Sequence, residues 1–319
     1  MRPLIHIGYH KTATTWFQKR LYPQVEDRRY IERRHVQRVL LSPTAFEFDA
    51  RIARDQLVGD ELQFGAVILC EEELSGNPHT GGMRGFQSLE TARRLQQVLP
   101  DADIVVVVRN QVDMAASLYA HYIREGGTRG AARYFQPASW RKDVARHPFK
   151  YPLFSWDYLD YRGLIRHYQA LFGVERVHVF CFEDFLRDIR AFIPDFVQRL
   201  GLRVTLGEDL SFEAENRGYG INALRVGRLL NLFTYRSVLD KQYLVPLLSN
   251  KLRSRIPQWI AAGPFAGAAA DAERVLPPSL IADLHAYFGP RNNELAELLD
   301  RDLGTLGYPL VNGDPMPSS

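Results

Sequence analysis

The chain has 319 residues, and its 46% hydrophobic content is enough for the core of one large α/β domain or of two small ones. Lysine and arginine number 40 against 37 for aspartate and glutamate, so the small excess of positive charge gives no argument for nucleic-acid binding. No apolar signal-peptide core precedes the first strand and no run of about 18 apolar residues offers a membrane span, so we expect a soluble cytoplasmic protein.

The N-terminal run LIHIGYHKTATTWFQKRL, residues 4–21, predicts a buried strand, a short polar turn and a helix that opens at Thr14 or Thr15. This order leaves free backbone N–H groups at the helix start, beside Lys11 and two hydroxyls. Such a combination suits an anion such as phosphate or sulfate.

Three further apolar runs, at residues 66–70, 104–108 and 176–182, predict strands of a mainly parallel sheet, and we expect a short strand at residues 36–41. We expect helices at residues 43–57, 88–99, 112–124, 158–172, 185–200, 221–233, 243–252 and 279–300. The alternation of strands and helices indicates an α/β fold.

We expect a single domain over residues 1–319, with a sheet core at about 1–200 and a helical cover at about 201–319. Cys70 and Cys181 lie far apart in apolar runs, with no second cysteine nearby, so we expect two reduced core cysteines.

The anion-binding run departs from the phosphate loop of nucleotide kinases. A Walker A loop reads GxxxxGK[ST], whereas Lys11 follows Gly8 by three residues and the second glycine is absent. Such kinases also place an aspartate near the end of a buried strand to hold magnesium, but the strand at 104–108 is followed by Arg109. Because an arginine repels a metal ion and attracts an anion, we expect a ligand with two anionic groups and no obligatory metal.

The segments GYHKTATTW and VVVVRNQVDMAASLY resemble the sulfotransferases that use 3′-phosphoadenosine 5′-phosphosulfate (PAPS). Two later segments, HYQALFGVERVHVFCFEDFLRD and ELAELLDRDLGTLGYP, resemble the strand-and-YEDL segment and the C-terminal helix of that family. The resemblance covers most of the chain. It implies a P-loop-like three-layer sandwich with a central, mainly parallel sheet and a helical C-terminal part. It also implies PAPS as cofactor and adenosine 3′,5′-bisphosphate as product.

By this resemblance, Lys11 neutralises charge on the phosphosulfate, while Arg109 and Ser117, eight residues later, hold the 3′-phosphate. Trp16 matches the position where some members stack a ring on the adenine, although it could equally be a core aromatic. Ala13 stands where many members have glycine, so a positive φ there would penalise it by about 1 kcal/mol. The implied cofactor-binding residues are His10, Lys11, Thr12, Ala13, Thr14, Thr15, Trp16, Arg109, Ser117 and, from the segment at 215–220, Arg217, which could equally lie in a surface turn.

Sulfuryl transfer needs a base for the acceptor proton, and Glu71, Glu72 and Glu73 follow the strand at 66–70. The C-terminal ends of parallel strands are where open α/β sheets bind ligands. The run ILCEEELS resembles the SSE segment of the family, and in that register Glu72 falls on the family glutamate. Strand alternation allows only one or two of the three to face the site, and we rank Glu72 before Glu71 and Glu73. His10 and His79 are alternatives.

The sequence therefore predicts a sulfotransferase in which Lys11 and Glu72 are catalytic. We expect the acceptor to be a hydroxyl or amine of a glycan, a phenol or a tyrosine. The aromatic-rich stretch at 126–156 could bind any of these, so it does not distinguish them. The alternatives are an atypical nucleotide-dependent kinase and a non-catalytic nucleotide-binding relative. The oligomeric state is open.

Overall fold

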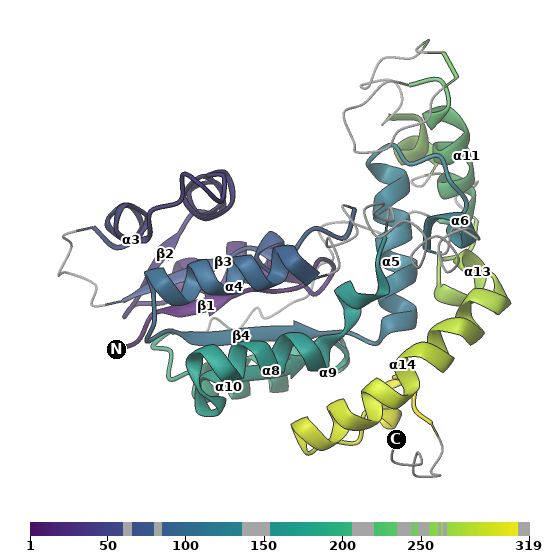
Figure 1. Ribbon diagram of the computed structural model, residues 1–319. Helices are drawn as coiled ribbons and strands as arrows, with labels where there is room; N and C mark the ends of the chain where they lie inside the picture. The colour runs from purple at the N-terminus through teal and green to yellow at the C-terminus, as the bar shows by residue number, and fades with distance from the viewer. Residues whose placement is uncertain are drawn as a thin grey trace. The chain divides into compact units, whose positions relative to one another are not determined.

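The computed structural model describes residues 1–59, 66–79, 85–135, 154–205, 220–234, 244–245, 247, 255–260, 263 and 267–311. The chain divides into two compact units (Figure 1). The first, which we call the sheet unit, comprises Met1–Asn77, Gly85–Arg109 and Asp160–Glu213. The second, the helical unit, comprises Pro78–Arg84, Asn110–Leu159 and Ala214–Ser319. The expectation of one domain stays a prediction.

The sheet unit is built on five parallel strands in the order β2-β3-β1-β4-β5. The strands are β1 (Leu4–His6), β2 (Arg29–Ile31), β3 (Val67–Cys70), β4 (Asp103–Val108) and β5 (Val177–Cys181). In the register, His6 of β1 lies beside Cys70 of β3 and Val105 of β4. The C-terminal ends of β1, β3 and β4 therefore meet at one edge of the sheet.

Both faces of the sheet are buried. Leu4, Ile68, Val105 and Phe180 belong to a core cluster with the helical segments that follow β1 and β5. Residues at the alternate positions, such as Ile5, Leu69 and Val106, point to the other face and are fully buried too. The predicted α/β three-layer sandwich with a central parallel sheet is confirmed.

The helical segments around the sheet have these bounds. After β1 come α1 (Thr14–Trp16), the π-helical η1 (Phe17–Leu21) and the 3-10 turn η2 (Tyr22–Gln24); after β5 come α9 (Phe182–Arg187) and α10 (Ile189–Arg199). The others are α3 (Ala50–Val58), the 3-10 turn η4 (Glu72–Ser75), α4 (Phe86–Val98) and α8 (Tyr161–Phe172), of which α8 packs on β4 and β5, and α4 on α8.

One predicted strand is wrong. Residues 36–41 are helical, within α2 (Arg33–Val36) and the π-helical η3 (Gln37–Leu41), because Val36, Val39 and Leu40 are spaced to bury one helical face. The strand of this region is β2 instead. It lies at the edge of the sheet, where the half-buried Arg29 and Tyr30 are tolerated, so its sequence lacks the apolar pattern of a central strand.

Two predicted helices differ in extent. Asp188 divides the segment at 185–200 into α9 and α10, because its backbone is extended and its carboxylate accepts the N–H groups of Arg190 and Ala191. The predicted helix at 43–57 starts only at Ala50, after Asp49, whose carboxylate likewise caps it.

The helical unit contains α5 (Gln111–Arg124), α6 (Ala131–Phe135), the 3-10 turn η6 (Trp156–Leu159), α11 (Ile221–Asn231), α13 (Ala272–Val275), α14 (Pro278–Leu299) and the 3-10 turn η8 (Gly304–Leu306). Helices α11, α13 and α14 all pack against α5. Most of the helix predicted at 243–252 lies outside the described residues.

Both cysteines are buried and free, which confirms the expectation for Cys70 and Cys181. Across the described part of the chain, no helix has the length and hydropathy needed to cross a membrane.

Candidate active site

The loop between β1 and α1 lies at the C-terminal edge of the sheet and packs directly against the glutamate run. Gly8 adopts a φ of +55°, and a Cβ added there would lie 3.2 Å from Thr14 Oγ1 and 3.5 Å from Glu72 Cα. Only glycine combines this φ with so close an approach. The loop and Glu72 therefore occupy adjoining positions in the sheet unit.

The same loop contains two strained residues. Ala13 has a φ of +61°, the positive value that the sequence comparison with glycine-containing members raised for this position. Lys11 has a φ of +70°. A left-handed backbone costs about 1–2 kcal/mol for a residue with a Cβ. Strain of this kind is typical of active sites and ligand clamps, where the surrounding structure imposes it.

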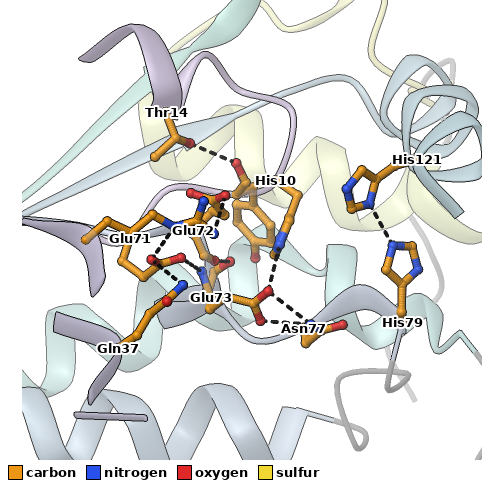
Figure 2. A network of polar contacts seen from close by, with 12 residues as sticks. His10, Thr14, Gln37, Glu71, Glu72, Glu73, Asn77, His79 and His121 are labelled. Carbon is orange, nitrogen blue, oxygen red and sulfur yellow. Dashed lines mark hydrogen bonds and ion pairs between the residues drawn. The ribbon is translucent and has the colours of Figure 1, made fainter. Parts of the chain in front are cut away.

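The hydroxyl groups of two threonines form hydrogen bonds within the loop. The buried Thr12 donates its Oγ1 proton to the carbonyl of Tyr9 at 2.7 Å, and the same oxygen accepts the N–H of Tyr9 at 3.3 Å. Thr14 Oγ1 reaches the Tyr9 carbonyl at 3.4 Å (Figure 2). In the described chain, no acceptor lies against the backbone N–H groups of Thr14 and Thr15, so these two donors remain available for an anion.

Trp16 lies in the core of the sheet unit. Its side chain is 6% exposed, and its ring meets Phe17 and Phe185 edge to face at 5.5 and 5.4 Å between ring centroids. These contacts suit the alternative of a core aromatic. Adenine stacking by Trp16 stays a prediction.

Arg109 follows β4 and turns back over the loop. Its Nη1 donates to the carbonyl of Lys11 at 3.2 Å, its guanidinium lies 5.0 Å from the centroid of the Phe182 ring, and its own carbonyl accepts the hydroxyl proton of Tyr161 at 2.7 Å. The ring of Tyr161 in turn meets Tyr9 of the loop. The Arg109 cation is thus fixed beside the strained backbone of Lys11.

The structure does not test the two remaining predicted anion ligands. Ser117 lies half-buried in α5, which belongs to the helical unit, and Arg217 lies outside the described residues. Their roles stay predictions.

Glu71 is fully buried and its carboxylate accepts three hydrogen bonds (Figure 2). Arg33 Nε and Gln37 Nε2 donate to Oε2 at 2.6 and 2.9 Å, and the backbone N–H of Glu73 donates to Oε1 at 3.0 Å. Burial raises the pKa of Glu71, although the hydrogen bond from Arg33 opposes the rise. With its oxygens engaged in this way, Glu71 ties the segment after β2 to the turn after β3.

Glu72 has one engaged oxygen and one unengaged oxygen. Its Oε1 pairs with Arg33 Nη2 at 2.9 Å, whereas Oε2 is buried without a hydrogen-bond partner among the described residues. A buried carboxylate oxygen without a donor costs free energy, which in an active site is explained by a proton or ligand that it receives during function.

Glu73 turns toward the loop and toward Asn77 (Figure 2). Its Oε1 lies 3.3 Å from Nε2 of the buried His10, and Asn77 Nδ2 donates to both of its oxygens at 3.0 and 2.9 Å. Burial favours a higher pKa for Glu73, but the hydrogen bond and charge of His10, with Asn77 and Arg33, outweigh it and lower the pKa. His10 is therefore engaged by a carboxylate at the loop.

His79 belongs to the helical unit, not to this cluster. It shares hydrogen bonds of 2.8 Å with the hydroxyl of Tyr134 and with His121 Nδ1, and it is 8% exposed. Arg33, which pairs with two of the glutamates, was not predicted. A basic residue two positions after a strand was the available signal, but β2 itself had not been identified.

No family model matches the chain, and no curated protein matches it in sequence. A crystal structure of a sulfotransferase from Alicyclobacillus acidocaldarius is similar with a TM-score of 0.57 and 18% identity, over 96% of this chain and 99% of that chain. The crystal structure of a mouse sulfotransferase, SULT7A1, complexed with PAP, matches with a TM-score of 0.42 and 14% identity, over 90% of this chain and 83% of that chain. The first likeness, at this level of identity, establishes the fold alone: the chain has the fold of a sulfotransferase.

Proposed function

We propose that the chain is a PAPS-dependent sulfotransferase that moves the sulfuryl group to a hydroxyl or amine of an acceptor. The observation that carries this proposal is the convergence, within the sheet unit, of three features at one edge of the sheet. These are the strained loop with Lys11, the cation of Arg109 fixed against that loop, and the unengaged carboxylate oxygen of Glu72.

The donor groups of the loop fit a phosphosulfate. Gly8 lets the backbone turn closely, and Lys11, with the backbone N–H groups of Thr14 and Thr15, offers donors and positive charge. Arg109 supplies a second cation for a further phosphate. When bound, PAPS would supply the activated sulfuryl group.

Glu72 would act as the base. As the acceptor oxygen bonds to sulfur, its proton would pass to the unengaged oxygen of Glu72, and the bond between sulfur and the bridging oxygen would break. Arg33 holds the other oxygen of Glu72 and so fixes the carboxylate in place. An amine acceptor would lose its proton to the same oxygen.

Lys11 would stabilise the leaving group. Negative charge grows on the bridging oxygen as the bond to sulfur breaks, and a fixed ammonium with helix N–H groups lowers the energy of that charge. Adenosine 3′,5′-bisphosphate would then leave.

The test is a transfer screen with labelled PAPS across glycan, phenol and tyrosine-peptide acceptors. We expect label to reach at least one acceptor class, without added metal. Calorimetric titration of the same protein with adenosine 3′,5′-bisphosphate and with magnesium-ATP distinguishes the kinase alternative, because tighter binding of magnesium-ATP would overturn the proposal. Binding of the bisphosphate with no transfer to any acceptor would instead support a non-catalytic nucleotide-binding protein.

A further inference from the structure

The helical unit contains a cationic cavity that shares no residue with the proposed nucleotide site. The cavity has a volume of about 440 Å³ and lies between α5, α6, α11 and α13. Four arginines line it: Arg133 of α6, Arg225 and Arg228 of α11, and Arg274 of α13. This volume falls in the range of small-molecule sites, roughly 300–1,000 Å³.

Among the described residues, most of this positive charge has no carboxylate partner. Arg274 pairs with Asp271 at 2.6 Å, but Arg133, Arg225 and Arg228 make no ion pair with a described carboxylate. Among the described residues that line the cavity, none is aspartate or glutamate. Three guanidinium groups around one cavity, without a carboxylate partner in the described part of the chain, attract anions, and their planar donor geometry suits carboxylate, phosphate and sulfate.

Helix α11, which presents Arg225 and Arg228, is held against α5. The buried Asn231, at the end of α11, donates to the carbonyls of Ile123 and Gly127 at 2.8 and 2.7 Å. A Cβ added to Gly227 would lie 3.4 Å from Ile123 Cγ2, so α11 approaches α5 closely one residue before Arg228. The part of the cavity wall formed by α11 is therefore preorganised for binding.

Apolar and aromatic side chains also line the cavity. These are Leu224, Val275 and Pro277, together with Tyr119, whose hydroxyl donates to the carbonyl of Arg129 at 3.0 Å. A lining of arginines and apolar side chains suits a ligand with a carbon ring that carries anionic substituents.

We propose that this cavity, which we call the arginine pocket, binds a sugar-sized ligand with at least two carboxylate, phosphate or sulfate groups. This proposal does not depend on the proposed sulfotransferase function.

Isothermal titration of the full chain tests the binding. The probes are glucose 1,6-bisphosphate and glucarate, which distinguish phosphate from carboxylate as the anion, with neutral glucose as the control. We expect at least one dianion to bind, more weakly as salt rises, and glucose to show no binding. The double variant Arg225→Gln, Arg228→Gln should bind that dianion at least about tenfold more weakly, because two charge-assisted contacts are lost.

The matched control is Arg190→Gln, which removes an exposed arginine of α10 in the sheet unit and should leave dianion binding unchanged. Thermal unfolding should give nearly the same melting temperature for all three proteins, because the replaced arginines are exposed. Equal binding of glucose, no binding of either dianion, or unchanged binding by the double variant would overturn the inference. Competition between the dianion and adenosine 3′,5′-bisphosphate for one site would overturn it too.

Discussion

Arg109 in the sheet unit and Arg225 in the helical unit are cations of the same kind held in different ways. Arg109 donates to a backbone carbonyl, lies over an aromatic ring and has its own backbone fixed by Tyr161. Arg225 is exposed and projects from a well-anchored helix into a cavity. The fixed position of Arg109 suits a reaction that needs its groups held in place. The exposed side chains of the arginine pocket can adjust to ligands of different shape.

The comparison predicts that single substitutions in the sheet unit have large effects. The largest is expected for Glu72→Gln, which keeps the shape of the side chain but removes the base. We expect kcat to fall by about 10²–10⁴-fold, with KM for PAPS little changed, because general-base catalysis contributes that much. Steady-state transfer rates measure this.

Glu73→Gln and Glu47→Gln serve as controls for that variant. Glu47 is an exposed residue in a turn, so its substitution should leave kcat unchanged. Glu73→Gln can keep one of the two hydrogen bonds from Asn77 and should lower kcat much less than Glu72→Gln. If Glu73→Gln is the more damaging variant, the assignment of the base passes to Glu73.

The next largest effect is expected for Arg109→Ala. Loss of a charged hydrogen bond to the 3′-phosphate should weaken adenosine 3′,5′-bisphosphate by about 1.5–3 kcal/mol, or roughly 10–150-fold. Binding of 5′-AMP, which lacks that phosphate, should weaken far less. Calorimetric titration of both nucleotides decides the matter, and an equal loss for the two contradicts the role of Arg109.

Low pH should lower the stability of the sheet unit without changing the charge of the arginine pocket. His6 of β1 is fully buried against Tyr22, and burial lowers its pKa from 6.5 to about 3. The folded sheet unit thus favours neutral His6, so the stabilisation is complete above the unfolded pKa and is lost as the pH falls from 6.5 toward 3. Linkage gives a loss of about 2 kcal/mol between pH 7 and pH 5. Arginines keep their charge throughout this range.

Urea unfolding at several pH values measures this loss. In His6→Gln the free energy of unfolding should vary less with pH between 7 and 5, whereas His285→Gln, at an exposed position of α14, should behave like the unchanged protein. The same pH dependence in His6→Gln as in the unchanged protein would show that another group causes the acid sensitivity.

The smallest effect is expected for Ala13→Gly, which relieves the left-handed strain in the loop. We expect a gain in unfolding free energy of up to about 1 kcal/mol, because the relief of strain exceeds the added entropy of the unfolded chain. Ala282→Gly in α14 should lower stability by about 0.5–1 kcal/mol, since glycine disfavours a helix. Thermal unfolding should show a higher melting temperature for Ala13→Gly and a lower one for Ala282→Gly. A lower melting temperature for Ala13→Gly would contradict strain at this position.

The sequence predicts the central part of the site well and its periphery poorly. Strands β1, β3 and β4 are apolar throughout, so their positions and the residues that follow them, Glu72 and Arg109 among them, could be predicted. The edge strand β2 is partly polar, so Arg33 could not be assigned to the glutamates. The Arg33 side chain decides which oxygen of Glu72 remains unengaged, and no local sequence pattern predicts this contact.

Arg33 also couples the edge strand to the charge of the glutamate run. Without β2 in place, Glu71 and Glu72 would lose the cation that pairs with both of them, and their charges would repel an anion near the loop. If the loop binds a nucleotide as proposed, a chain with β2 undocked would bind it more weakly. The nucleotide would then stabilise the chain in which β2 has docked, so that ligand binding would favour complete assembly of the sheet.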